Sequence, residues 1–214
     1  MKLLAVDTAL GACSVAVLEG DAVLVHRYEL MERGHAEALA PMVEEAMSSA
    51  GLPFASIDRL AVTTGPGTFT GQRVGLAFMR GLRVALGKPL MGLTTLGAMA
   101  EAARTETGLV DAAALHDARR GEVYLEIVGE VPLAPVVLSF EEAVTLLAKR
   151  GGAIALAGTA AAAACERLPN ATLSSIHQPD ALWVARLARN LPDNPEPPRP
   201  LYLRAPDAKL PVPK

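Results

Sequence analysis

The 214-residue sequence contains only two cysteines, Cys13 and Cys165, and both lie in apolar segments. This excludes a disulfide-stabilised scaffold and predicts a reducing compartment, the cytoplasm. Aromatic residues make up 4% of the chain and hydrophobic residues 51%, so we expect a core of alanine, valine and leucine. No hydrophobic run reaches membrane-spanning length, and the apolar start ends at Asp7, which predicts a first strand rather than a signal peptide.

The chain also lacks an excess of positive charge. Its formal net charge is −3, with 9 basic against 10 acidic residues in 1–105 and 11 against 13 in 106–214. Proteins that bind nucleic acid alone usually concentrate lysine and arginine on one surface. We therefore expect any contact with nucleic acid to depend on a partner that supplies the missing charge.

Two kinds of catalytic site are absent from the sequence. The four histidines, His26, His35, His116 and His177, are too far apart in sequence to form a helical metal-binding pair. No Lys-Ser or Lys-Thr follows the glycines of residues 65–75, so this run is not a Walker A loop. Neither a metallopeptidase nor a P-loop nucleotidase is favoured, and no bound metal is expected.

The most informative segment is the glycine-rich run from Gly65 to Gly75. A β-branched stretch, 60–64, precedes it and helical spacing of apolar residues follows it, so the run links a strand to a helix. Such a loop can hold an anion with its backbone N–H groups and the helix dipole, or it can let the helix pack closely on the sheet. Thr68 or Thr70 can cap the helix. Both interpretations of the loop remain open at this point.

The order of predicted elements is similar in the two halves of the chain. The first half is expected to form strands at about 2–7, 13–18, 22–29, 58–64 and 90–93, with helices at about 36–50, 72–86 and 95–104. The second half is expected to form strands at about 109–116, 122–128, 136–138 and 153–157, with helices at about 140–149, 160–167 and 180–190.

This pattern predicts an α/β protein with two RNase H-like lobes and the fold of actin, hexokinase and Hsp70. The expected lobes are 1–105, which holds the partner-binding helices, and 106–214. Residues 192–214 contain eight prolines and are expected to form an extended tail on the surface.

Several motifs carry a resemblance to a known family. They are Asp7-Thr8, the run Gly65-Pro66-Gly67-Thr68-Phe69-Thr70-Gly71, the run Asp117-Ala118-Arg119-Arg120-Gly121-Glu122-Val123-Tyr124, and Pro200-Leu201-Tyr202-Leu203-Arg204. In this order and spacing they resemble the bacterial TsaB family, also called YeaZ, over nearly the whole chain.

The resemblance implies a role in making threonylcarbamoyladenosine, a modified base beside the anticodon of ANN-decoding tRNAs. It implies a non-catalytic, activating subunit that pairs with a catalytic paralogue, TsaD, and is joined by a small ATPase, TsaE. The alternative is a small actin-fold ATPase or kinase that uses Asp7 and the glycine-rich loop. Ala9 occupies a position where that machinery favours glycine, so we expect a structural Asp7 and no cofactor beyond weak ATP or ADP binding.

Two sets of site residues follow, and no catalytic residue is assigned. The weak nucleotide or anion site consists of Asp7, Thr8, Gly65, Gly67, Thr70, Gly71 and Arg73. The helices of 36–50 and 72–86 are expected to bind the paralogue, or to form a homodimer in its absence, because they carry more apolar and small residues than one sheet contact requires. The expected interface residues are Leu39, Val43, Met47, Gly75, Phe78, Gly81, Leu82 and Ala85.

Overall fold

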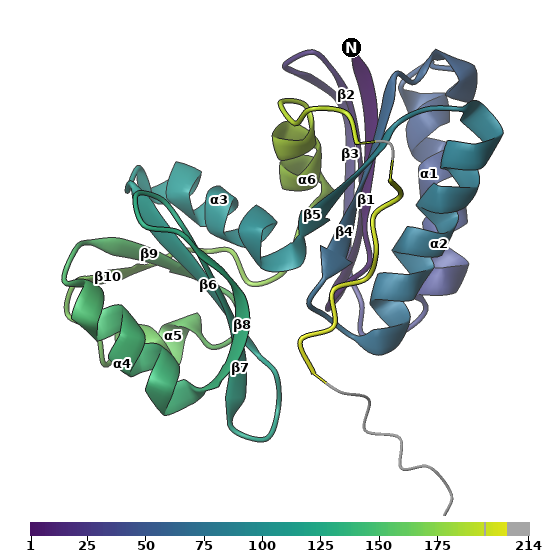
Figure 1. The fold of residues 1–214 in the computed structure, drawn as a ribbon. Coiled ribbons are helices and arrows are strands. Elements are labelled where there is room, and N and C mark those ends of the chain that lie inside the picture. The colour runs from purple at the N-terminus through teal and green to yellow at the C-terminus, as the bar shows by residue number, and fades with distance from the viewer. Residues whose placement is uncertain (195, 205–214) are drawn as a thin grey trace, which may run out of the picture.

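Two mixed β-sheets of five strands each form the framework of the protein (Figure 1). The computed structural model describes residues 1–194 and 196–204. The first sheet has the order β3-β2-β1-β4-β5 and consists of β1 (Lys2–Asp7), β2 (Ala12–Glu19), β3 (Ala22–Leu30), β4 (Arg59–Gly65) and β5 (Leu90–Thr94). The second has the order β10-β9-β6-β7-β8 and consists of β6 (Asp111–Asp117), β7 (Glu122–Val128), β8 (Leu133–Ser139), β9 (Ile154–Ala157) and β10 (Ala171–Leu173).

The two sheets have the same connectivity. In each, three antiparallel strands are followed by a helix, a parallel strand, a second helix and another parallel strand. The predicted α/β fold with a repeated element order is therefore confirmed. The sequence prediction missed β10 because three residues are too few for a clear alternating pattern.

Helices cover the sheets in layers (Figure 1). α1 (His35–Ser49) and α2 (Phe69–Leu86) pack on one face of the first sheet, and α4 (Phe140–Arg150) and α5 (Ala161–Cys165) pack on the outer face of the second. α3 (Thr95–Thr107) contacts strands of both sheets and joins the two lobes. Its alanine-rich sequence allows this burial on several sides, because small side chains let backbones approach closely.

The helix starts follow from side-chain capping. The Thr68 hydroxyl accepts a hydrogen bond from the Gly71 N–H at the start of α2, and Thr94 caps α3 in the same way. Ser139 and Glu142 form a reciprocal capping box at the start of α4. Of the two candidates for the cap of α2, Thr68 therefore fills the role and Thr70 is exposed.

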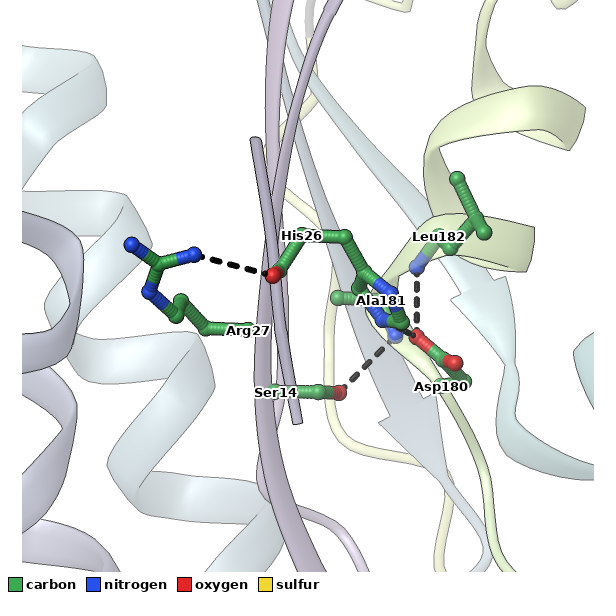
Figure 2. A network of polar contacts seen from close by, with 6 residues as sticks. All are labelled: Ser14, His26, Arg27, Asp180, Ala181 and Leu182. Atoms are coloured by element: carbon green, nitrogen blue, oxygen red, sulfur yellow. Dashed lines mark hydrogen bonds and ion pairs between the residues drawn. The ribbon is translucent and has the colours of Figure 1, made fainter. Parts of the chain in front are cut away.

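The last helix, α6 (Ala181–Ala188), returns to the first sheet, where its alanines and Val184 pack on β1 and β2. Figure 2 shows how its start is anchored: Asp180 caps the helix and its Oδ1 lies 2.8 Å from His26 Nε2. The Ser14 hydroxyl accepts a hydrogen bond of 2.8 Å from the Ala181 N–H. The expected C-terminal lobe of 106–214 is thus incorrect for this helix, because its apolar face is buried on the N-terminal sheet.

The chain then runs in extended form beside α2 (Figure 1). The Leu201 N–H donates to the Thr64 carbonyl at 2.8 Å, which holds this segment at the end of β4. The predicted extended course is confirmed for 192–194 and 196–204, whereas residues 195 and 205–214 lie outside the described part of the chain.

Candidate functional site

The glycine-rich loop between β4 and α2 packs tightly against the turn between β1 and β2. A Cβ atom added to Gly67 would lie less than 3.0 Å from the Ala9 carbonyl oxygen, and one added to Gly71 would lie equally close to the Thr8 carbonyl oxygen. The Thr68 N–H donates to the Ala9 carbonyl at 2.8 Å. Of the two interpretations of this loop, close packing is the one that the geometry favours.

Asp7 lies at the end of β1 and is completely buried. Its Oδ1 accepts hydrogen bonds from the Thr63 hydroxyl at 2.5 Å and from the Ala9 N–H at 3.4 Å, while its Oδ2 has no hydrogen-bond partner among the described residues. Burial raises the pKa of the Asp7 carboxyl from 3.8 to about 7, although these hydrogen bonds act in the opposite direction. Asp7 therefore has the environment of a structural carboxyl rather than of an exposed metal ligand.

Thr8 connects the same turn to α2. Its hydroxyl donates to the Gly71 carbonyl at 2.7 Å and accepts from the Gly75 N–H at 3.0 Å. Gly11, in the turn, donates its N–H to Gln178 Oε1 at 2.9 Å. The Thr8 hydroxyl and the Gly75 and Gly11 N–H groups, which could otherwise bind a phosphate, are thus engaged within the protein.

The remaining residues of the predicted anion site do not converge. Thr70 is exposed, and Gly65 packs against Gln72 and the Leu201 carbonyl. The Arg73 side chain turns toward the C-terminal segment, where its Nε donates to the Tyr202 hydroxyl at 2.8 Å. The structure therefore does not bring the seven residues into one cradle.

The predicted interface residues also divide into two groups. Leu39, Val43, Met47 and Gly75 are buried on the first sheet, so their assignment to a partner surface is wrong. On α2, Phe78 and Leu82 are half-buried against the same core, whereas Gly81 and Ala85 are exposed, so the assignment of this helix to a partner surface stays a prediction. A Cβ atom on Gly81 would meet no described residue within 4 Å.

Functional candidates missed by the sequence analysis lie in the C-terminal part of the chain and at the lobe junction. Gln178 contacts Gly11 in the turn after β1, and Tyr202 contacts the predicted site residue Arg73, but each lies more than a hundred residues from its partner in sequence. Glu126 of β7 accepts a hydrogen bond of 2.9 Å from the Thr94 hydroxyl, and burial raises the pKa of its carboxyl to about 7. Of these residues, the sequence pointed only to Tyr202, which lies in the motif Pro200-Leu201-Tyr202-Leu203-Arg204.

Two further features concern broad classes of function. Within residues 1–194 and 196–204, no group of three or more histidine, cysteine, aspartate or glutamate residues could hold a metal ion. No helix among the described residues is both long and apolar enough to cross a membrane.

The two lobes have the actin-like fold, and comparison with known structures supports this fold. Component A of Acidaminococcus fermentans (R)-2-hydroxyglutaryl-CoA dehydratase aligns with 88% of this chain and 97% of its own, at 12% identity and a TM-score of 0.54, which shows the fold alone. YeaZ from Pseudomonas aeruginosa aligns with 94% of this chain and 99% of its own, at 31% identity and a TM-score of 0.77.

The sequence comparisons agree with the similarity to the P. aeruginosa YeaZ structure. A family model for TsaD, tRNA N6-adenosine threonylcarbamoyltransferase, matches residues 28–175. The Escherichia coli (strain K12) tRNA threonylcarbamoyladenosine biosynthesis protein TsaB is 40% identical over 124 residues, which cover 58% of this chain and 53% of that protein. The chain belongs to the TsaB (YeaZ) family. Its alignments span about half the length of the E. coli TsaB and of the corresponding Haemophilus influenzae protein.

Proposed function

We propose that this chain is the non-catalytic, activating subunit of a cytoplasmic complex that makes threonylcarbamoyladenosine beside the anticodon of ANN-decoding tRNAs. Its catalytic partner is a TsaD-like paralogue, and a TsaE-like ATPase joins the pair. The observation that carries the non-catalytic role is the close packing of the glycine-rich loop on the Thr8–Ala9 backbone. The name of the E. coli relative supports the pathway.

The loop packing also weighs against the ATPase or kinase alternative. A phosphate between Gly67, Gly71 and the first turn would have to separate backbones that contact each other directly. We propose that the chain needs no cofactor and binds ATP or ADP weakly at most. We expect the purified chain to hydrolyse ATP no faster than a buffer control, and turnover that is lost in Asp7→Ala would support the enzyme instead.

The exposed face of α2 is the proposed partner surface. Ala77, Gly81 and Ala85 follow one another at helical spacing and are all exposed, and Val84 is 79% exposed beside them. Small residues let a helix from another subunit approach the α2 backbone closely. The same face can pair two copies of this chain about a two-fold axis when the paralogue is absent.

The proposed interface is tested by Gly81→Leu. Because the space around Gly81 is open, the chain should fold while the added side chain blocks a partner helix. The matched control is Gly152→Leu, which also enters open space but lies in the second lobe after α4. We expect only Gly81→Leu to lose the TsaD-like subunit in a pull-down, to become monomeric in light scattering, and to lose threonylcarbamoylation of tRNA by the reconstituted proteins. Equal association of both variants would place the interface elsewhere.

A further inference from the structure

Arginines are concentrated along one strip of the molecule despite the net charge of −3. α2, the β6–β7 turn (117–122) and the C-terminal segment (196–204) together hold seven arginines and three acidic residues. Two of these acids are engaged: Asp117 accepts a hydrogen bond from the Arg119 N–H, and Glu122 pairs with Arg204. The arginines are Arg73, Arg80, Arg83, Arg119, Arg120, Arg199 and Arg204.

The C-terminal segment brings these three parts of the chain together. Arg80 of α2 donates to the Pro198 carbonyl at 3.1 Å, which holds the segment along the helix. Further along, Arg204 Nη1 donates to the Ala118 carbonyl at 2.8 Å in the β6–β7 turn. The segment thus bridges the two lobes and aligns arginines from both of them.

Two of the few aromatic residues are displayed in the middle of this strip. Phe69 is 53% exposed and Tyr202 is 43% exposed, and their rings stack with centroids 6.0 Å apart. The Arg73 guanidinium lies 3.5 Å from the centroid of the Phe69 ring. We call Phe69, Arg73 and Tyr202, together with Arg119 and Arg120, the arginine–aromatic patch.

The β6–β7 turn adds an unusual backbone. Arg119 and Arg120 have φ values of 65° and 57°, and both side chains are exposed. Two adjacent residues in the left-handed region favour glycine and asparagine, so arginine is not the residue that the turn geometry selects. This points to a role for the two guanidinium groups outside the turn itself.

We infer that the arginine–aromatic patch binds unpaired nucleotides of the tRNA substrate, an inference that rests on the proposed function. Arginines contact phosphates, while exposed aromatic rings and guanidinium planes stack on unpaired bases. Stacked exposed rings beside several guanidinium groups match the way in which proteins hold unpaired bases and their phosphates together, so we favour RNA over an acidic protein surface. The patch is small, so the isolated chain binds tRNA weakly and the patch contributes mainly within the complex.

The test is fluorescence anisotropy with an unmodified ANN-decoding tRNA transcript, titrated with the assembled complex of the chain and its TsaD-like subunit. The variants are Tyr202→Ala and the double variant Arg119→Asn/Arg120→Asn, since asparagine tolerates the left-handed backbone. The matched control is Arg186→Ala, which removes an exposed guanidinium 4.6 Å from the Trp183 ring on α6, across the first sheet from α2.

We expect each patch variant to weaken tRNA binding about fivefold or more, and the control to leave it unchanged. The double arginine variant should also reduce the slope of log affinity against log salt by roughly one to two, because phosphate contacts release counterions. Tyr202→Ala should leave that slope unchanged, because stacking carries no charge.

The outcomes separate this inference from the proposed function. If the wild-type chain fails to support threonylcarbamoylation with its partners, the proposed function is wrong. If it supports modification and both patch variants bind tRNA as the control does, only the RNA-binding inference is overturned. If a patch variant loses a protein subunit of the complex while its tRNA affinity is unchanged, the RNA-binding inference is also overturned, and the patch is a protein-docking surface.

Discussion

Replacing Asp7 by asparagine tests the structural role of this buried carboxyl. Asparagine keeps the shape and can accept the hydrogen bonds from the Thr63 hydroxyl and the Ala9 N–H through its Oδ1. It removes the ability to ionise. If Asp7 only supports the first turn, the variant should fold, associate with its TsaD-like partner and support threonylcarbamoylation.

The magnitude follows from the pKa shift. Burial raises the pKa of Asp7 from 3.8 to about 7, so between these pH values the folded state binds the proton more tightly than the unfolded state. The contribution of this carboxyl to the free energy of unfolding is therefore greatest below about pH 4. It decreases as the pH rises from there to about 7. At roughly 1.4 kcal/mol per pKa unit, the loss amounts to about 4 kcal/mol.

The assay is urea unfolding of both proteins at several pH values from about 4 to 8. We expect the free energy of unfolding of Asp7→Asn, minus that of the wild type, to grow by about 4 kcal/mol across this range. The Glu126 carboxyl, whose pKa burial also raises to about 7, contributes equally to both proteins and cancels in the difference. A difference that does not change with pH would refute the argument, and a folded variant that cannot support modification would assign Asp7 a functional role.

Two other predictions concern stability and are measured by urea unfolding. Gly71→Ala should lower the free energy of unfolding by about 2 kcal/mol or more, because its Cβ would overlap the Thr8 carbonyl, whereas Gly81→Ala in the same helix should raise it by about 1 kcal/mol. Equal effects of the two would contradict the close packing of the loop. Arg59→Ala should cost about 3 kcal/mol, since the largely buried guanidinium donates to the carbonyls of Ala188, Arg189 and Leu191 at the end of α6. The control is Arg27→Ala, which removes an exposed ion pair with Glu45 and should change the free energy of unfolding by less than about 1 kcal/mol. If Arg59→Ala and Arg27→Ala lose similar amounts, Arg59 does not anchor α6.

The order of elements could be predicted from the sequence because local signals mark it. Alternating or continuous apolar runs define most strands, and capping residues such as Thr94 and Asp180 mark helix starts. Local signals do not indicate which part of the tertiary structure a helix or strand packs against. α6 has an ordinary apolar stripe, and nothing in that stripe indicates that it packs on the first sheet rather than the second.

The same limitation explains the error at the predicted interface. Leu39, Val43 and Met47 recur every four residues, as expected for one face of a helix, but the pattern does not say what covers that face. The sheet covers it, so the proposed partner surface is restricted to the small exposed residues of α2. Gly81 and Gly75 look alike in sequence, yet Gly75 touches the Thr8 hydroxyl and Gly81 faces open space.

Charge counted along the chain has a similar limitation, which bears on the proposed contact with tRNA. Neither half of the sequence is basic, because the count averages over residues that the fold separates. The C-terminal segment places Arg204 beside the β6–β7 turn and Tyr202 beside Phe69, so the local field and the stacking surface depend on tertiary structure. Under the proposed function, a chain that binds tRNA weakly by itself supplies one contact once its TsaD-like partner brings the rest of the RNA within reach.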